Sequence, residues 1–196
     1  MIGLHKLMKN DTLGTAEVYR TLIRLASAAA IAGGLLVSTP CSFASARSTA
    51  LANDFEFFCM RGKPTYESLE EAAVALKLQP KKELARDMGN GNRIRSKSWT
   101  VGDNTGAYEL VTSDAVNGDV SVESCGIGSA DGLGGEVFAD LQAHYNLGSA
   151  QASLSANGQV KTVVWTMESG EKVILTHATS GPGLYLTLID KTKLGK

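Results

Sequence analysis

Alternation of apolar and polar residues dominates the second half of the chain and predicts antiparallel β-strands. Neighbouring side chains in a strand point to opposite faces, so a half-buried strand alternates with a period of two. Asn117-Gly118 separates two of these segments, and Asn-Gly favours the tight turn of a β-hairpin. We predict about six strands, within residues 96–102, 107–114, 119–125, 159–167, 172–179 and 183–190.

Two other segments repeat apolar residues every three or four positions, which predicts amphipathic helices. In the first, residues 63–80, Thr65 is placed to cap the N-terminus and Pro80 to end the helix. Its expected buried stripe comprises Leu69, Ala73 and Leu76. The second helix covers residues 135–148, and its expected buried stripe comprises Val137, Phe138, Leu141 and Tyr145.

The segments between these elements have weaker patterns. Residues 47–53 are expected to form a flexible start, residues 81–93 a helical turn and an exposed loop, and residues 126–135 a glycine-rich connector. The aromatic segment 55–60 should pack into the core. The fold class that follows is α+β, a two-layer domain with both helices on one face of the antiparallel sheet.

The two halves of this domain, residues 54–125 and 134–190, resemble each other. Each contains Trp-Thr before a turn that ends in glycine, with a threonine six residues after the glycine: Trp99, Gly106 and Thr112 in the first half, and Trp165, Gly170 and Thr176 in the second. One interpretation is an internal repeat of a helix and three strands, about 66 residues apart. The alternative is that amphipathic hairpins resemble each other without a duplication.

A short apolar run near the N-terminus predicts export. It covers 13 residues, 25–37, and follows Arg20 and Arg24. Crossing a bilayer takes about 20 apolar residues, so the run is too short for an anchor and suits the apolar region of a secretory signal.

The residues after this run predict where the signal is cut. Ala44 and Ala46 place small residues at the positions that a signal peptidase reads. We therefore predict a signal peptide over residues 1–46, cleaved after Ala46, and a single domain over residues 47–196. The alternatives are a lipid on Cys41, although Pro40 stands where a small residue is needed, and an uncleaved anchor. Translation starts at Met1 or Met8.

The predicted mature chain is mildly acidic, with 15 basic and 18 acidic residues. A nucleic-acid-binding protein needs a basic surface, so this balance argues against a nucleic-acid partner. Without a second long apolar run, we expect no stable membrane anchor after processing. The expected location is the periplasm or the medium.

Two cysteines remain after cleavage, Cys59 and Cys125. In an oxidising compartment such a pair predicts a disulfide. The cross-link would close a loop of 66 residues, and the chain-entropy model gives it about 4 kcal/mol of stabilisation, with measured values often lower.

Candidate catalytic residues are few. His144 is expected at the edge of the second helix's buried stripe and His177 late in a strand. A catalytic base needs a partner within hydrogen-bond reach, and no motif brings one to either. Each is therefore interpreted first as a packed or surface histidine.

Other chemistry-bearing patterns also favour structural roles. The glycines between Gly126 and Asp131 lack the third glycine of a dinucleotide loop, so we expect a connector. The helix carboxylates Glu67, Glu70 and Glu71 are expected to form a solvated face. Trp99 and Trp165 could line a ligand groove, but their matched positions favour core packing. We predict no catalytic residue, no metal site and no cofactor.

The segments FEFFC, VSVESCGI and VFADLQ, followed by VVWTM, VILTHA and LYLTLI, resemble a loose set of small exported proteobacterial proteins with two cysteines. The resemblance covers most of the predicted mature chain, and it implies a disulfide-tied periplasmic domain without implying catalytic residues. Secreted β-lactamase inhibitory proteins are similar in architecture alone, as tandem repeats of a helix and an antiparallel sheet.

These observations favour a non-enzymatic binding or accessory protein of the bacterial envelope, whose partner is an envelope protein or a small ligand. Two alternatives remain: a periplasmic hydrolase whose site is assembled only in the fold, and a proteinaceous inhibitor of a secreted enzyme. Fold analogy alone does not choose between them.

Overall fold

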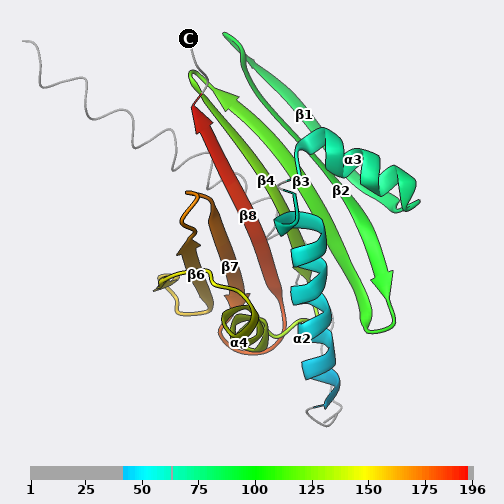
Figure 1. Cartoon of the computed structure of the whole chain (residues 1–196), viewed down its shortest axis with the longest axis vertical. Coiled ribbons are helices and arrows are strands. Elements are labelled where there is room, and N and C mark those ends of the chain that lie inside the picture. Colours follow the sequence, from blue (N-terminus) through cyan, green and yellow to red (C-terminus); the bar gives the residue numbers. More distant parts are fainter. Residues whose placement is uncertain (1–41, 63, 194–196) are drawn as a thin grey trace, which may run out of the picture. The chain divides into compact units, whose positions relative to one another are not determined.

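One antiparallel sheet of eight strands forms the centre of the fold, in the order β1-β2-β3-β4-β8-β7-β6-β5 (Figure 1). The computed structural model describes residues 42–62 and 64–193. The strands are β1 (Gln79–Gly89), β2 (Asn92–Asp103), β3 (Gly106–Asn117), β4 (Val120–Ser129), β5 (Ala150–Leu154), β6 (Val160–Thr166), β7 (Lys172–Ala178) and β8 (Leu184–Lys193). The six predicted strands are present, and the α+β class is confirmed. The expected number was too small, because β1 and β5 were not foreseen.

Both unforeseen strands lie at the edges of the sheet. Their residues are almost all exposed, so they lack the alternation that marks a half-buried strand. β1 was read as a helical turn because Lys, Glu, Ala, Arg and Met favour helices. The turn at Gly89, Asn90 and Gly91, all with positive φ, instead folds β1 back along β2. The charges of β1 also suit an edge strand, since they discourage pairing with other chains.

All helices of the described part pack on one face of the sheet (Figure 1). They are α2 (Ser42–Phe55), which continues into the π-helix η1 (Glu56–Met60), α3 (Tyr66–Ala75) and α4 (Gly134–His144). Thr65 caps α3 as predicted, accepting a hydrogen bond from the Ser68 backbone N–H at 3.2 Å. α3 nevertheless ends before Pro80, because Lys77 adopts a positive φ of 56° and Pro80 begins β1. Leu76, expected in the core, is consequently 51% exposed.

The expectation of a flexible start over residues 47–53 was wrong. This segment is part of α2, and Leu51, Ala52 and Phe55 are buried against the sheet. The signal was hidden because the buried stripe contains Arg47 and Ser48, two residues that a hydrophobic pattern does not count. The predicted cleavage point after Ala46 lies within this helix, and residues 1–41 are outside the described part.

The core lies between the sheet and the helices. Trp99 and Trp165 are its largest members, only 2% and 0% exposed, and Phe138 of α4 stacks on Trp165 with ring centroids 5.5 Å apart. Burial of one large apolar side chain contributes about 1.5–3 kcal/mol. The core interpretation of both tryptophans is confirmed.

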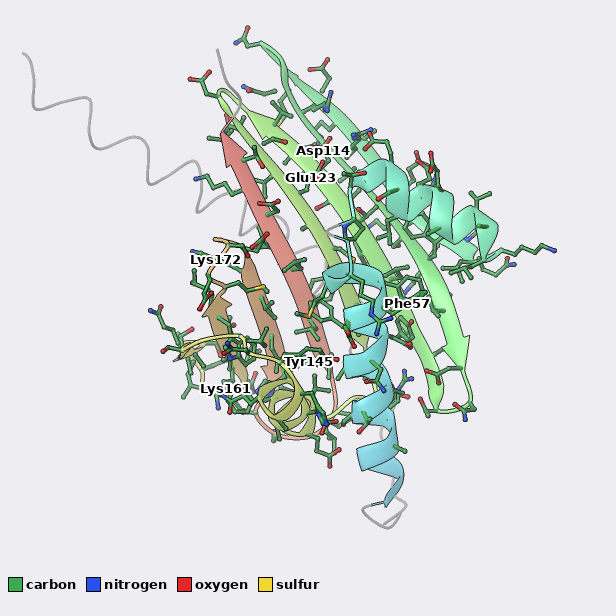
Figure 2. The ribbon with its side chains drawn as sticks, viewed as in Figure 1. Phe57, Asp114, Glu123, Tyr145, Lys161 and Lys172 are labelled. Carbon is green, nitrogen blue, oxygen red and sulfur yellow. A yellow bond between two sulfur atoms is a disulfide. The ribbon has the colours of Figure 1, made fainter. Side chains whose placement is uncertain are left out.

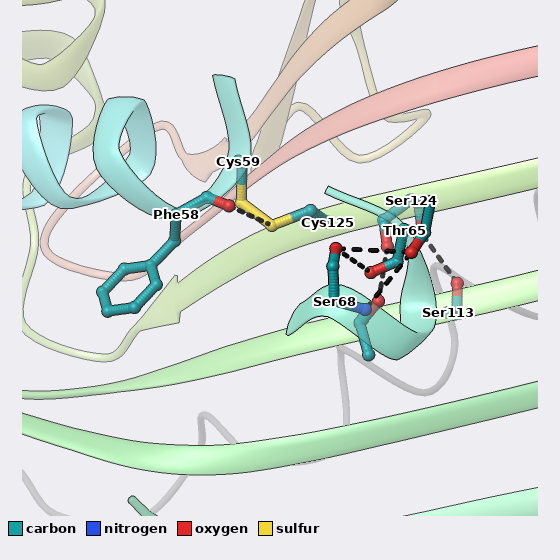
Figure 3. Close-up of a disulfide and its surroundings, with 8 residues drawn as sticks. Phe58, Cys59, Thr65, Ser68, Ser113, Ser124 and Cys125 are labelled. Atoms are coloured by element: carbon teal, nitrogen blue, oxygen red, sulfur yellow. Dashed lines mark hydrogen bonds between the residues drawn. A yellow bond between two sulfur atoms is a disulfide. The ribbon is translucent and has the colours of Figure 1, made fainter. Parts of the chain in front are cut away.

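A disulfide joins Cys59 of η1 to Cys125 of β4, as predicted (Figure 3). The two Cα atoms are 5.3 Å apart, within the usual range for a disulfide. Both cysteines are buried in the core, together with Phe58. The bond therefore fastens the helix layer to a central strand.

The glycine-rich segment 126–135 is not a flexible connector. Gly126 and Gly128 lie inside β4, and Gly132 and Gly134 pack closely against other elements. A Cβ on Gly132 would stand 2.7 Å from a Leu51 methyl, and one on Gly134 would stand 2.2 Å from the His177 Cβ. These glycines therefore permit close packing.

The sheet divides into two similar arrangements around its central pair of strands, β4 and β8. α3 precedes the four-stranded meander β1–β4, and α4 precedes the meander β5–β8. Trp99 and Trp165 occupy matching places on the third strand out from the centre. Thr112 and Thr176 do not match, because Thr112 pairs with Cys125 on the helix-bearing face while Thr176 pairs with Tyr185 on the other face.

Candidate binding surface

The face of the sheet opposite the helices, called here the helix-free face, carries no helix of the described part. Strand register and alternation assign its residues. On four adjacent strands they are Ile94, Ser96, Ser98 and Thr100 of β2; Glu109, Val111, Ser113 and Ala115 of β3; Val122, Ser124, Gly126 and Gly128 of β4; and Tyr185, Thr187, Ile189 and Lys191 of β8. The face combines small hydroxyl residues with β-branched apolar ones.

Side chains in the middle of this face are largely buried. Six of its described side chains expose less than a tenth of their surface: Ile94, Ser98, Ser113, Ala115, Thr187 and Ile189. Val111, Val122, Ile174 and Val164 beside them are half-buried. No helix of the described residues covers this centre, and apolar patches on a protein surface can mark interaction sites.

Positive charge surrounds this middle region. Among the described residues the register places Lys82, Arg86, Lys172 and Lys191 on the helix-free face, and the hydrogen bond of Lys81 to Glu109 places Lys81 there too. The one acidic side chain placed there is Glu109, whose Oε2 accepts a hydrogen bond from Lys81 Nζ at 2.7 Å. The chain as a whole has a net charge of −1, so this face is more basic than the average of the chain.

Tyr185 lies over two glycines of the neighbouring strand. A Cβ built on Gly128 would be 3.1 Å from the Tyr185 ring, and one built on Gly126 would be 3.1 Å from Tyr185 Oη. Packing an aromatic ring over glycines shields exposed backbone in a sheet. Burial raises the pKa of Tyr185 to about 12.

Hydroxyl groups on this face differ in their hydrogen bonding. Ser113 and Ser124 bond to each other at 2.6 Å (Figure 3), and Thr162 bonds to Thr176 at 3.4 Å. Ser98 Oγ is buried and has no hydrogen-bond partner among the described residues. A buried hydroxyl group without a hydrogen-bond partner costs about 1–3 kcal/mol of stability. Ser98 is therefore in an unfavourable position on this face.

On the opposite side, a layer of charged residues lies beneath α3. Arg95 donates from Nε to Asp114 Oδ2 at 2.8 Å and from Nη2 to Glu67, and its guanidinium lies 4.2 Å from the Tyr66 ring centroid. Lys97 donates to Glu70. Two of the three predicted solvated carboxylates, Glu67 and Glu70, therefore bind the sheet, whereas Glu71 is exposed.

Two acidic residues, Asp114 of β3 and Glu123 of β4, extend this charged layer, and both are labelled in Figure 2. Asp114 is buried and also accepts from Arg93 Nη2 at 3.1 Å. Burial, and then the charge of Asp114, raise the pKa of Glu123. The layer fastens α3 to the sheet through ion pairs, in addition to the apolar packing of Leu69 and Ala73 in the core.

A second polar cluster surrounds Arg47 of α2, which is 4% exposed. Its guanidinium donates to Asp131 Oδ1 at 3.2 Å, to Thr105 Oγ1 at 3.0 Å and to the Ala107 carbonyl oxygen at 2.6 Å. Asp103 Oδ1 lies 3.5 Å from Arg47 Nη1. Burial disfavours the Asp103 carboxylate, but hydrogen bonds from Thr105 and Gly106 outweigh this effect and lower its pKa.

Two small hollows flank the disulfide on the helix-bearing side. The first has a volume of about 20 Å³ and is lined by Cys125, Glu123, Glu171 and Asp190, among others. The second, of about 30 Å³, lies between Met60 and Met167. Each has room for about one or two water molecules, which is too little for an organic substrate.

The two histidines are not brought together. His144 ends α4, where it is exposed and its Nδ1 lies 2.9 Å from the Asp140 carbonyl oxygen. His177 packs against Gly134, at the other end of the same helix. His144, expected at the edge of the buried stripe, is thus a surface residue, and His177 has a packing role.

Sequence reasoning missed both charged clusters. Arg47 belonged to the segment expected to be flexible, and Arg95 and Lys97 gave no pattern by themselves. Of these residues, only Asp103 has a role that the sequence could have indicated. Its Oδ1 accepts hydrogen bonds from the Thr105 and Gly106 backbone N–H groups at 2.6 and 2.9 Å. Such an Asx turn is recognisable from Asp-Asn-Thr-Gly.

Comparison of the chain with protein-family models, curated proteins and solved structures found no match. In the described residues, no helix has the length and apolarity to cross a membrane. Within the same residues, no group of three or more His, Cys, Asp and Glu side chains is placed to hold a metal ion.

Proposed function

We propose that the protein is a non-enzymatic binding or accessory protein of the bacterial envelope and that it binds its partner on the helix-free face. The observation that carries the proposal is the composition of this face: a dry centre of β-branched and small residues with a basic rim, on a sheet whose other face holds the helices. Antiparallel sheets with one solvated face usually present alternating polar residues there, and the centre of this face departs from that pattern.

The titratable groups on the helix-bearing side support a structural assignment. Arg47, Arg95 and Lys97 are each engaged with carboxylates that lie on other elements. Such interactions hold helices in place, and this accounts for the charged residues without a reaction.

Export is part of the proposal. Arg47, the first residue after the predicted cut, is also the first residue of α2 whose described side chain joins α2 to other elements. A domain starting there would keep the Arg47 cluster intact. The Cys59–Cys125 disulfide supports an oxidising compartment.

We further propose that the two halves are an internal repeat of a helix and four strands. The matching order of elements about β4 and β8, and the matching places of Trp99 and Trp165, support a duplication. The Gly-to-Thr spacing does not support it, because Thr112 and Thr176 face opposite sides.

The binding surface is tested on the protein as it is produced in cells, so that a natural ligand can remain bound. It is purified from the envelope fraction and examined by native mass spectrometry for a bound mass, in the wild type and in Val111→Glu, which places a charge at the centre of the face. Gln142→Glu, at an exposed position of α4, is the matched control. We expect the bound mass to be lost in Val111→Glu alone, while denaturation midpoints show that both variants are folded.

The proposal fails if the purified protein turns over a panel of ester, peptide or glycan substrates and loses this activity on His144→Ala or His177→Ala. A mass spectrum with and without reductant tests the export claim separately. An intact 196-residue chain with two free thiols at positions 59 and 125 would contradict it.

A further inference from the structure

We infer that two copies of this protein pair through strand β5, antiparallel and centred on Ala152, so that their sheets join into one continuous sheet. This inference does not depend on the proposed function, because it uses the backbone edge of the sheet and not its helix-free face.

The outer edge of β5 carries backbone groups that no described strand pairs with. β5 ends the sheet beside β6, and the hairpin that joins them continues to Ser155, whose N–H donates to the Val160 carbonyl oxygen at 2.8 Å. Residues of an antiparallel strand alternate between directing their N–H and C=O groups at one neighbour and at the other. Ala150, Ala152 and Leu154 therefore direct theirs away from β6. All residues from 148 to 160 are exposed, so this edge is open.

The two edges of the sheet are protected differently. β1, at the other edge, has charged residues at positions 81–83, 86 and 87 and two irregularities in its register with β2. Charges and bulges of this kind oppose pairing of an edge strand with another chain. β5, with the sequence AQASL, has no charge, no proline and no irregularity in its register. Its five residues are an ordinary length for a strand, so β5 is the edge that can accept another strand.

The sequence of β5 is complementary to itself in one antiparallel register. When Ala152 lies opposite Ala152 of the second copy, Ala150 lies opposite Leu154, and Gln151 lies opposite Ser153. Leu154, which is 64% exposed, is then placed beside a small residue that leaves room for it. No like charges meet, and the three outward-directed residues of each copy face one another, so that each pair exchanges both of its hydrogen bonds.

This geometry closes at two copies. The same strand is used on both copies, which gives a two-fold interface and no open-ended assembly, and the charges of β1 oppose growth at the other edges. Both helix layers lie on the same side of the joined sheet. α4 contacts β7, and the β7 strands of the two copies are five strand spacings apart, about 24 Å in total. Helices about 10–12 Å in diameter therefore do not collide.

Pairing through β5 has a consequence for the helix-free face. Because the two copies are related by an axis perpendicular to the sheet, their helix-free faces point in the same direction and lie side by side. The dimer would present two equivalent surfaces to a partner, and binding at one would raise the effective concentration at the other.

The experiment follows the monomer–dimer equilibrium by sedimentation velocity, with the protein purified with its disulfide intact. We expect a reversible dimer that forms at high protein concentration, because an edge of five residues is small beside a stable interface of about 1,600 Å². Ala152→Pro should weaken dimerisation about tenfold, since it removes an outward N–H group from both copies. Proline is tolerated where the N–H group of an edge strand faces solvent, so this variant should remain folded.

Charges at the centre of the pair provide a second test. Ala152→Lys places two like charges opposite each other and should prevent dimerisation, and Ala152→Glu should do the same. A mixture of these two variants should form a mixed dimer, because opposite charges then meet. Ala85→Lys, at an exposed position of β1, is the matched control and should dimerise like the wild type.

Three results would overturn the inference. The first is a wild type that stays monomeric at every concentration, and the second is equal behaviour of Ala152→Lys and Ala85→Lys. The third is a mixture of Ala152→Lys and Ala152→Glu that stays monomeric although urea denaturation shows both variants to be folded. Val111→Glu, at the centre of the helix-free face, should leave the dimer unchanged. Loss of the dimer in Val111→Glu but not in Ala152→Pro would place self-association on that face and contradict pairing through β5.

Discussion

Arg47 Nε donates to Asp131 Oδ1 at 3.2 Å, which ties the start of helix α2 to the loop between β4 and α4. The two residues are far apart in sequence, and Arg47 also reaches Thr105 of the β2–β3 turn and Ala107 at the start of β3. One buried side chain thus joins three separate segments of the chain.

We expect Arg47→Met to destabilise the protein by about 2 kcal/mol, because hydrogen bonds to a charged group contribute roughly 1.5–3 kcal/mol. The loss is kept below that of a fully buried ion pair because the Asp131 side chain is 57% exposed and can be hydrated. Urea denaturation with a common m-value measures the difference.

Arg61→Met provides the comparison. Arg61 is 67% exposed and makes one described ion pair, to Glu56 at 3.2 Å. Exposed pairs of this kind contribute about 0–1 kcal/mol, so the midpoint should change little. Equal costs for the two substitutions would show that the Arg47 cluster does not stabilise the fold.

Replacement of both disulfide cysteines, Cys59→Ser with Cys125→Ser, should cost about 2–5 kcal/mol. The bond closes a loop of 66 residues and restricts the unfolded chain. The buried hydroxyls would add a desolvation cost, so Cys59→Ala with Cys125→Ala should be the less damaging pair. If the alanine pair unfolds at the wild-type urea midpoint, the cross-link does not contribute to stability.

Local patterns in the sequence were sufficient for most of the sheet and for helix α3. Six half-buried strands, the α3 cap at Thr65, the Asn117-Gly118 turn and the disulfide all follow from alternation, turn chemistry and cysteine count. These features could be predicted because each depends on residues within one short segment. The disulfide could be predicted because the predicted mature chain has two cysteines, which allow one pairing.

The rest depends on tertiary context. β1 has the composition of a helix but pairs along β2, and β5 is exposed throughout. Arg47 and Arg95 are buried or half-buried only because carboxylates from other segments meet them. The helix-free face could be anticipated as an alternating surface, but which of its residues lie side by side on neighbouring strands depends on the register.

Tyrosines with raised pKa values should make the free energy of unfolding depend on pH in the alkaline range. Burial, followed by the hydrogen bond that Tyr145 Oη donates to Glu56 Oε2 at 2.8 Å, raises the pKa of Tyr145 to about 12. An unfolded tyrosine loses its proton near pH ~10. The contribution of Tyr145 to stability is therefore complete below pH ~10 and is lost as the pH rises toward 12.

Phenolate absorbance during an alkaline titration measures this directly. The folded protein should show tyrosines that ionise well above the usual range, and Tyr145→Phe should remove one of them while Tyr185, also near 12, remains. The variant should also lose less stability between pH ~10 and 12 than the wild type. Ionisation of every tyrosine near pH ~10 in the folded state would contradict the burial of these side chains.

Two adjacent glycines at the start of α4 should respond in opposite directions to the same substitution. Gly135→Ala places a methyl group where nothing lies within 4 Å, so it should stabilise the helix by about 0.5–1 kcal/mol. Gly134→Ala would place its Cβ 2.2 Å from both Cβ and Cγ of His177. The helix would have to move away from β7, at a cost of about 1–3 kcal/mol. The stabilities of the two variants are measured by thermal and urea denaturation. If Gly134→Ala is as stable as Gly135→Ala, α4 does not pack on His177 as described.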